Sequence, residues 1–363
     1  MRSWKGMVVA AGRALEEWFD RLRFGLKRRT GRIGPVEILP YRGHGTRDTL
    51  FLKGRVLEMV GTAPPSADDS RRRNLRNMAR RFWSSEIPHA RVRASHGGHE
   101  LEEVADEEGF FDLRFELEEP LEGGTGWHPV EIELLWPQAG EGSGARARGS
   151  VLVPAGARFG VISDLDDTVI RSSATDLLKM ARIVLLRNAH TRLPFEGVGD
   201  FYRALQLGPS EEDFNPIFYV SSSPWNLYAV LEDFLDVHGV PAGPLFLKDW
   251  SPTTLRDHDR HKLGVIRTLL TTYPDLPFVL IGDSGERDPE IYRQIVYEHP
   301  GRIRAIYIRD VTTGERDAAV HAIAGELKNF GVEMLLTADT VEAAEHAAEK
   351  GLISPNALPA SRE

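Results

Sequence analysis

The second half of the chain alternates between short apolar runs and amphipathic stretches, and this rhythm limits the possible folds more than any other feature. The short runs are apolar throughout, as expected for strands of a parallel sheet that is covered by helices on both faces. The alternating segments after Pro154 are 159–163, 176–187, 216–221, 227–238, 261–273, 278–281, 289–299 and 303–308, with a last strand and helix at 333–337 and 340–350. The sequence therefore predicts a doubly wound α/β domain over residues 157–350.

The preceding segment, residues 36–156, has a different pattern. Its short β-like runs are separated by turn residues, and they are 36–39, 49–57, 90–94, 110–117, 130–136 and 149–153. Such spacing is typical of an antiparallel sheet or sandwich. One helix is expected at 71–83, with a dense arginine face that is more often solvated or ion-paired than a ligand site. We therefore expect a mainly β, sandwich-like N-terminal domain, the α/β domain after it, and a flexible tail over residues 351–363.

Residues 1–35 form a separate basic segment. Between residues 1 and 33, nine lysines and arginines face three acidic residues, which leaves a charge of +6. Apolar residues such as Trp4, Trp18 and Leu22 recur at helical spacing, so an amphipathic helix is expected. Two interpretations stay open, because such a helix can pack on its own protein or lie on an anionic membrane surface.

The composition excludes several kinds of chemistry. The chain has 363 residues and no cysteine, so it cannot use a thiolate nucleophile, a disulfide or a cysteine-ligated metal. A net charge of −9 argues against a nucleic-acid partner. No run approaches the ~18 apolar residues that span a bilayer, and the apolar stretch at 7–11 is too short for a signal-peptide core. We expect a cytoplasmic protein, with peripheral attachment to a membrane as a further expectation.

Polar residues follow the apolar runs at the places where ligands bind in α/β sheets, beyond the carboxyl ends of the strands. The first run ends in Asp164 and Asp166, two apart, so that one carboxylate can attack an electrophile while the other handles a proton. Ser221 follows the second run, at the start of the next helix, a place that favours bound phosphate. Lys262 opens the helix before the third run, and Asp283 follows that run as a candidate cation ligand.

These motifs resemble the haloacid dehalogenase (HAD) superfamily of phosphotransferases. The matching residues are Asp164, Asp166, Thr168, Ser221, Lys262, Gly282, Asp283 and Asp288. More narrowly, the segments 221–226 and 282–292 resemble the App1-type phosphatidate phosphatase catalytic domain. The superfamily resemblance covers residues 157–345 and implies a HAD-like, Rossmannoid parallel sheet with helices on both faces.

The resemblance implies a Mg²⁺-dependent phosphatase that works through an aspartyl-phosphate. Asp164 is then the nucleophile and Asp166 the acid and base, while Mg²⁺ is held by Asp164, the backbone carbonyl of Asp166, and Asp283. Asp288 is expected to orient Lys262 or the metal shell. The groups expected to contact the phosphoryl oxygens are Ser221, Ser222, Thr168 and Lys262.

Plainer interpretations are favoured for several nearby residues. Asp167 is expected to be a solvated or capping acid, and the polar run 257–261 a loop rather than a metal cluster. Ser222 could substitute for Ser221, its neighbour. Lys262 is preferred over Lys248 because it lies just before the helix that leads into the Asp283 strand.

The expected substrate follows from the openness of the site and from the resemblance. Only ~48 residues separate the first motif from the second, too few for a large inserted cap domain. An open site suits a bulky or membrane-embedded substrate, and the resemblance favours phosphatidate, with diacylglycerol as the product. A soluble or protein phosphomonoester is the alternative, as is a non-catalytic module that docks on a membrane or protein.

Overall fold

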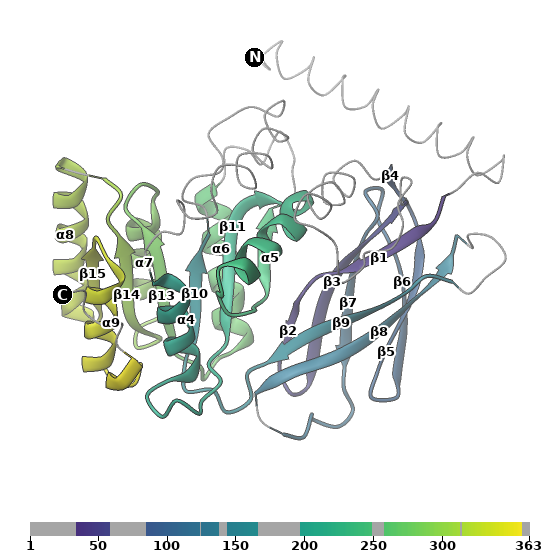
Figure 1. Ribbon diagram of the computed structural model, residues 1–363, viewed down its shortest axis with the longest axis horizontal. Helices are drawn as coiled ribbons and strands as arrows, with labels where there is room; N and C mark the ends of the chain where they lie inside the picture. Colours follow the sequence, from purple (N-terminus) through teal and green to yellow (C-terminus); the bar gives the residue numbers. More distant parts are fainter. Residues whose placement is uncertain are drawn as a thin grey trace, which may run out of the picture.

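The computed structural model describes residues 34–58, 85–123, 125–137, 144–165, 197–248, 258–312 and 314–357. The basic N-terminal helix, the helices predicted at 71–83 and 176–187, and the residues Asp166, Asp167 and Thr168 lie outside this part of the chain. A strand-rich domain and a parallel-sheet domain lie side by side (Figure 1). No helix in the described ranges combines the length and apolar character that a membrane span requires.

The strand-rich domain confirms the predicted mainly β region. Its strands are β1 (Val36–Pro40), β2 (Gly43–Gly45), β3 (Thr49–Glu58), β4 (Ser85–Glu86), β5 (Arg91–His96), β6 (His99–Val104), β7 (Phe110–Glu116), β8 (Gly126–Trp136) and β9 (Arg146–Val153). They form one sheet in the order β1-β3-β2-β9-β8-β5-β6, with β4 and β7 also paired to β3. Alternate side chains of these strands fill one apolar core, which includes Leu50, Val92, Phe111, Ile132 and Val151.

Three strands of this domain were not predicted, and each has a physical reason. β2 and β4 are only three and two residues long, too short to show an alternating pattern. β6 is rich in acidic residues, and every position along it is exposed or only half-buried. It therefore lacks the apolar face by which a strand is recognised in a sequence.

The parallel-sheet domain confirms the predicted sheet with helices on both faces. Its strands are β10 (Gly160–Asp164), β11 (Ile217–Pro224), β12 (Leu245–Lys248), β13 (Phe278–Asp283), β14 (Ile303–Arg309) and β15 (Glu333–Thr337). The order is β12-β11-β10-β13-β14-β15, and every neighbouring pair is parallel. The change of direction in strand order falls beside β10, the strand that carries Asp164, which is where α/β sheets open to their ligands.

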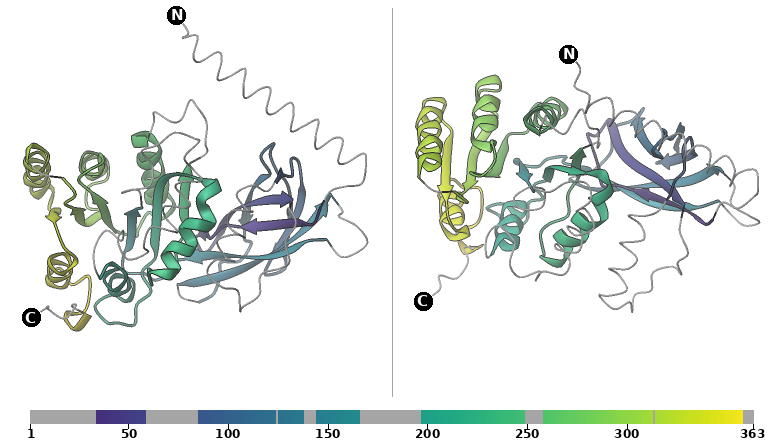
Figure 2. Two further views of the ribbon diagram at one scale, coloured as in Figure 1. Left: turned by 45° about the horizontal axis from the view of Figure 1, so that its top comes forward. Right: turned by 90° about the horizontal axis from the view of Figure 1, so that it is seen from above.

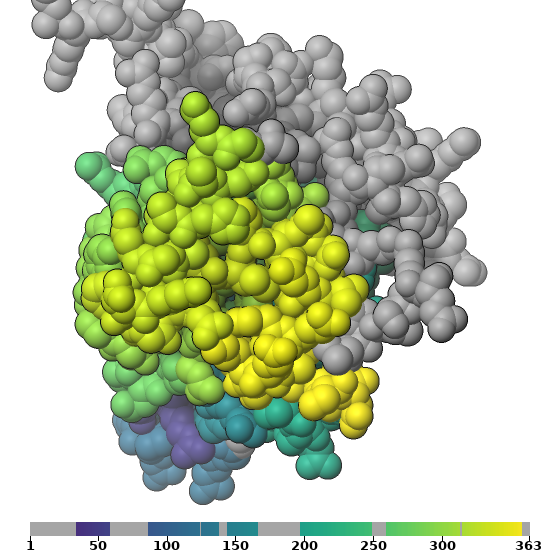
Figure 3. Space-filling model, turned by 90° about the vertical axis from the view of Figure 1, so that its left-hand side faces the viewer, coloured from purple at the N-terminus to yellow at the C-terminus, as the bar shows by residue number. Residues whose placement is uncertain are grey.

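Helices cover both faces of this sheet, as the view from above in Figure 2 shows. One face packs α4 (Val198–Leu207), α5 (Tyr228–Val237) and α9 (Thr340–Glu349). The other packs α6 (His258–Thr272), α7 (Asp288–Glu298) and α8 (Glu315–Leu327). Figure 3 shows the C-terminal part of the chain, in lime and yellow, at the β15 edge of the molecule.

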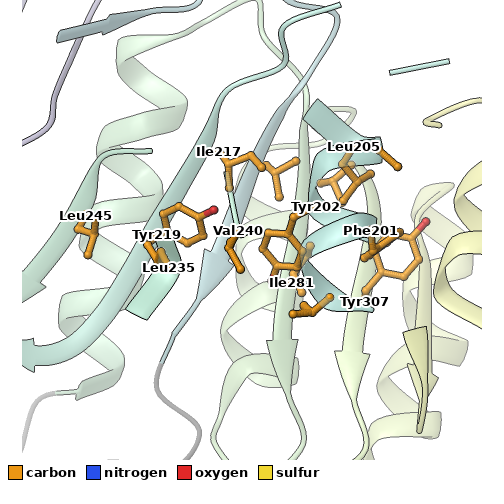
Figure 4. Packing of buried hydrophobic residues seen from close by; sticks show 14 of the residues in the cluster. Phe201, Tyr202, Leu205, Ile217, Tyr219, Leu235, Val240, Leu245, Ile281 and Tyr307 are labelled. Carbon is orange, nitrogen blue, oxygen red and sulfur yellow. The ribbon is translucent and has the colours of Figure 1, made fainter. Parts of the chain in front are cut away.

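Successive residues of β11 pack into two different cores, one on each face of the sheet. Ile217 and Tyr219 point to the α4 side, where Tyr202 and Leu205 meet them (Figure 4). Phe218 belongs to the core on the α6 side. Because both faces are covered, every position from Ile217 to Val220 is buried, and the strand is recognisable as one continuous apolar run.

Sequence patterns missed β12, α4 and α8. β12 has only four residues, and α8 presents many alanines, so that its apolar stripe is weak. The C-terminal segment also differs from the expected flexible tail, because Leu352 and Ile353 are buried in the core on the α4 side. Residues 358–363 lie outside the described part.

The two domains meet through aromatic and charged side chains. The His44 ring of β2 packs at an angle against Phe246 and edge-on against Tyr273, and its Nδ1 lies 3.2 Å from the Tyr273 hydroxyl. Arg42 forms an ion pair with Glu232 of α5 at 3.1 Å, and its backbone N–H donates to the Tyr228 hydroxyl. The interface therefore places the β1–β3 region of one domain against β12, α5 and α6 of the other.

Candidate active site

Adjacent strands bring the first acidic groups together. Asp164 ends β10, and the register that pairs Ser163 with Ile281 sets it beside the end of β13, where Asp283 lies. Carboxylate oxygens of Asp164, Asp283 and Glu286 lie within 4.8 Å of one another. The strand ends therefore gather three carboxylates at one point, and the third of them, Glu286, comes from the motif 282–292.

Lys262, from the first turns of α6, provides the positive charge at this point. Its Nζ lies 2.8 Å from Asp164 Oδ1 and 3.1 Å from Glu286 Oε2, and it also contacts Asp288. The side chain is only 4% exposed. Burial opposes the charged form, but the surrounding carboxylates outweigh it and raise the pKa of Lys262 well above its ordinary value. The group is therefore an ammonium at neutral pH.

Asp288 lies against the end of β13, the strand that carries Asp283. It is fully buried in the first turn of α7, where Oδ1 accepts from Lys262 and Oδ2 accepts from the Asp283 N–H at 3.1 Å. A Cβ at residue 282 would lie 2.2 Å from that Oδ2, so only glycine allows the close approach. Asp288 therefore fixes both Lys262 and the backbone of Asp283, which is consistent with the orienting role expected for it.

The two oxygens of Asp283 have different surroundings. Oδ1 accepts from the N–H groups of Gly285 at 2.6 Å and Glu286 at 2.9 Å. Oδ2 is buried and has no hydrogen-bond partner among the described residues. Burial, and then the nearby charge of Asp164, raise the pKa of Asp283 above its ordinary value. A buried carboxylate oxygen without a donor is costly, and a set of carboxylate oxygens suits a hard divalent cation such as Mg²⁺.

Ser221 lies on the strand next to Asp164. Val220 pairs with Asp164 in register, and the Leu165 N–H donates to the Val220 carbonyl at 3.1 Å. Ser221 is therefore the next residue at the same sheet edge. It is fully buried, its Oγ accepts from the Ser223 N–H at 3.0 Å, and Ser222 beside it is half-buried.

The structure separates the two candidate lysines. Lys248 ends β12, where it pairs with Pro224 in register, one strand farther from Asp164 than Ser221. Lys262 contacts Asp164 directly. Both are buried, so the difference lies in their position rather than in their exposure.

Arg316 of α8 is a site residue that the sequence patterns missed. Its Nε donates to the Ser284 carbonyl at 2.8 Å and its Nη2 to the Glu286 carbonyl at 2.6 Å, while Glu290 pairs with the guanidinium. Arg316 therefore holds the loop that follows Asp283. Glu286 could have been found, since it lies within the motif 282–292, but Arg316 lies in a helix that was not predicted and has no motif of its own.

A small pocket opens beside the acidic groups. It has a volume of about 50 Å³ and reaches from Asp164 and Asp283 between α4 and α9. Its walls are mostly apolar, and polar groups enter from the ends of β14 and β15; the lining includes Leu165, Phe201, Tyr202, Arg309, Thr337 and Thr340. The pocket thus lies on the α4 side of the site, and the charged Lys262 enters from the α6 side.

Residues 159–310 match the family model described as the catalytic domain of phosphatidate phosphatase APP1. This segment contains every residue of the candidate site described above except Arg316 and the pocket residues of β15 and α9. Asp166 and Thr168 also fall within the matched segment, although they lie outside the described residues.

Curated relatives agree with this match. Phosphatidate phosphatase APP1 of Saccharomyces cerevisiae is 34% identical over 179 residues, which are 47% of this chain and 30% of the yeast protein. An uncharacterised protein of Schizosaccharomyces pombe is 31% identical over 157 residues, which are 42% of this chain and 25% of that protein. The alignments thus span less than a third of either relative's length.

Among solved structures, a carbohydrate acetylesterase from Xanthomonas citri aligns with 79% of this chain and 72% of its own, at 12% identity and a TM-score of 0.25. That score is too low to carry an argument about the fold. The family match and the yeast relative, by contrast, agree with the motifs at the strand ends. The chain therefore contains an App1-type catalytic domain, which residues 159–310 form.

Proposed function

We propose that this protein is a Mg²⁺-dependent phosphatidate phosphatase with a HAD-like catalytic domain, which releases inorganic phosphate and diacylglycerol. The observation that supports the proposal most directly is the meeting of Asp164, Asp283 and Lys262 at one sheet edge within an App1-type domain. Carboxylates and an ammonium in this arrangement suit phosphoryl transfer, where positioning and charge stabilisation supply most of the catalysis. The lipid substrate comes from the likeness to the yeast enzyme.

In the proposed reaction, Asp164 acts as the nucleophile. A carboxylate oxygen attacks phosphorus, the bond from phosphorus to the lipid oxygen breaks, and Asp166 donates a proton to the leaving alkoxide. Asp166 then takes a proton from water, which attacks the aspartyl-phosphate and releases phosphate while restoring the Asp164 carboxylate. The role of Asp166 rests on the motif resemblance, since that residue lies outside the described part.

Lys262 and the serines provide the contacts to the phosphoryl oxygens. The Lys262 ammonium lies 2.8 Å from the nucleophile, close enough to neutralise charge on a group bound there. Asp288 holds this ammonium in place. Ser221 and Ser222 at the neighbouring strand end, together with Thr168, are the proposed hydroxyl contacts.

Asp164 and Asp283 are the side chains that would hold Mg²⁺, together with the Asp166 backbone carbonyl, and Glu286 lies close enough to join them. The ion, when bound, would offset the repulsion between these carboxylates and a phosphate group. Asp283 Oδ2, which has no hydrogen-bond partner within the described ranges, supports this assignment, because a cation would compensate its burial.

A soluble or protein phosphomonoester is the second candidate substrate. The small pocket beside Asp164, with a volume of about 50 Å³, favours it, because a compact leaving group would fit there more completely than a lipid. Phosphatidate would instead bind with its phosphate at Asp164 and its acyl chains outside the pocket.

Phosphate release by the full chain tests both candidates. The protein is incubated with Mg²⁺ and either phosphatidate vesicles or p-nitrophenyl phosphate, and Asp164→Asn and an excess of EDTA serve as controls. We expect release from phosphatidate that both controls abolish. Release from the soluble ester alone would favour the second candidate, and release that persists in Asp164→Asn or in EDTA would contradict the mechanism.

Attachment to membranes is a separate part of the proposal and rests on the +6 charge of residues 1–33. Each basic residue near an anionic surface contributes about 1 kcal/mol. We expect the full chain, but not a variant that lacks residues 1–33, to sediment with phosphatidate-containing vesicles, and high salt to reduce this binding. Loss of activity on soluble and vesicle substrates alike would instead show that the segment packs on its own protein.

A further inference from the structure

We infer that the strand-rich domain is part of the catalytic unit, because Arg55 and Tyr41 hold the segment Ser221–Asn226 in the shape that receives the phosphoryl group. This inference rests on the proposed function, and it assigns to Arg55 and Tyr41 a positioning role rather than a chemical one.

The segment Ser221–Asn226 begins where the regular pairing of the parallel sheet is interrupted. β11 pairs with β12 regularly at Tyr219 and Val220, but the register then shifts before Pro224 pairs with Lys248. The strand is therefore irregular between Val220 and Pro224, the stretch that carries Ser221. Sheet hydrogen bonds alone do not fix a chain at such a break.

Arg55 of β3 provides part of this support. Its Nη1 donates to Asn226 Oδ1 at 2.5 Å, across 171 positions of sequence. Asn226 lies in the 3-10 turn Trp225–Leu227, directly after the serine segment. Arg55 therefore contacts the end of the segment whose other end carries Ser221.

Arg55 is itself held rigidly. Its Nε donates to the Glu108 carbonyl at 2.9 Å, its Nη2 pairs with Glu86 at 3.0 Å, and its guanidinium lies 4.3 Å from the centre of the Phe110 ring. The residue is only 6% exposed. A guanidinium with so many fixed partners can set the position of Asn226 instead of following it.

Tyr41 holds the neighbouring residue of the turn. Its ring stacks on Trp225, with centroids 4.8 Å apart and an angle of 17° between the planes, and it also packs against Tyr228. Lys53 adds a cation–π contact to Trp225 at 5.7 Å. Consecutive residues of the turn, Trp225 and Asn226, are thus both held by the strand-rich domain.

These contacts matter for catalysis because phosphoryl transfer depends on geometry. A displacement of about 1 Å in a positioning group can cost 10²-fold in rate. Tyr41, Lys53 and Arg55 all lie outside the matched segment 159–310. The matched segment 159–310 therefore depends on the strand-rich domain for the shape of its motif Ser221–Asn226.

The test compares Arg55→Ala with Arg42→Ala in the full chain. Arg42 also bridges the two domains, but its side chain pairs with Glu232 and Asp236 of α5 and not with the serine segment. Binding of tungstate, as a phosphate mimic, is measured by calorimetry with Mg²⁺ present. Hydrogen exchange of the amides over residues 221–227 provides a readout that needs no activity.

We expect Arg55→Ala to weaken tungstate binding at least 10-fold and to speed exchange over 221–227, while Arg42→Ala stays within twofold of the wild type in both. Asn226→Ala should weaken binding similarly, and the double variant with Arg55→Ala should be no weaker than either single one, because both remove the same contact. Arg55→Lys should not rescue binding, since an ammonium cannot reproduce the guanidinium fork.

Two results would overturn the inference. In the first, Arg55→Ala binds tungstate and exchanges its amides over 221–227 like the wild type. In the second, Arg55→Ala and Arg42→Ala lose equal amounts of tungstate binding, which would indicate that both residues act through general docking of the domains. Failure of the proposed function gives a different result. In that case the wild type itself binds no tungstate and releases no phosphate, and the exchange comparison still decides whether Arg55 holds the segment.

Discussion

Four buried or half-buried carboxylates lie around one ammonium in the candidate site. Lys262 contacts Asp164, Glu286 and Asp288, and Asp283 lies within reach of Asp164 and Glu286. Four negative charges and one positive charge leave a formal charge of −3 among these side chains. Arg316 offsets part of this charge through its attraction to Asp283 and Asp288. The carboxylates of the described part of the site therefore still repel one another, and individual substitutions should expose this repulsion.

Asp283→Asn tests this repulsion. The amide keeps an Oδ1 acceptor for the two backbone N–H groups. It also places a donor at Oδ2, for which the described part of the chain offers no hydrogen-bond partner. In EDTA, we expect the melting temperature of the variant to lie about 2–4 °C above that of the wild type. A gain of about 1 kcal/mol in the free energy of unfolding produces such a shift in a large domain. Phosphate release should fall on the order of 10²-fold.

Calorimetric scans with EDTA and with Mg²⁺ provide the measurement. The exposed Asp275→Asn, on the loop before β13, is the control and should change neither property. A lower melting temperature for Asp283→Asn in EDTA would contradict the proposed repulsion.

Lys262→Met should be damaging for stability as well as for activity. Removing the ammonium leaves the fully buried Asp288 without its ionic partner, a change that costs about 3–5 kcal/mol when a buried pair is broken. Urea denaturation measures the loss, and adding Asp288→Asn should recover part of it. Lys248→Met is the matched buried control and should lower activity only modestly; the opposite ranking would mean that Lys248 is the functional lysine.

At the scale of elements, the end of β13 tolerates no added carbon at Gly282. A Cβ there would lie 2.2 Å from the buried Asp288 Oδ2. We expect Gly282→Ala to destabilise the protein by about 1–3 kcal/mol and to reduce activity by displacing Asp288 from Lys262. Urea denaturation and phosphate release measure the two effects.

Gly264→Ala is the control within α6, the helix that carries Lys262. Nothing lies within 4 Å of the added carbon, so this change should stabilise the helix by about 0.5–1 kcal/mol. If both glycine substitutions shift stability in the same direction, the tight contact with Asp288 is not what requires Gly282.

The elements also show why part of the site could be predicted and part could not. Asp164 and Asp283 end apolar runs, and parallel strands bring such ends to the same edge of the sheet, so their proximity follows from local patterns. Glu286 and Arg316 depend on how a loop folds back and how α8 packs against it. The bond between Arg55 and Asn226 joins two domains and left no periodic signal in the sequence.

At the scale of the whole molecule, we expect His44 to make the contact between the domains sensitive to pH. Its ring is enclosed by Phe51, Phe246 and Tyr273. Burial lowers the pKa of His44 from 6.5 to about 4. The unfolded chain thus takes up a proton between pH 6.5 and 4 that the folded protein does not, so stability is intact above pH 6.5 and falls as the pH drops through this window.

We expect the loss from His44 to reach on the order of 3 kcal/mol near pH 4. The measurement is urea denaturation at pH 7.5 and 4.5 of the wild type and His44→Gln, whose side chain does not titrate. Between these two pH values the variant should lose less stability than the wild type. Parallel losses in both proteins would show that His44 does not report on the domain contact.

The separation of the two sheets along the chain has a consequence for synthesis on the ribosome. All strands of the first sheet are complete at Val153, whereas Trp225 and Tyr228, which pack against Tyr41, come about 75 residues later. At 5–20 residues per second this interval lasts roughly 4–15 s. During that time Tyr41 keeps its contact with Phe110 but lacks Trp225 and Tyr228. The ring face that these two residues later cover is then available to chaperones or to neighbouring nascent chains, so slow translation between these points would prolong its exposure.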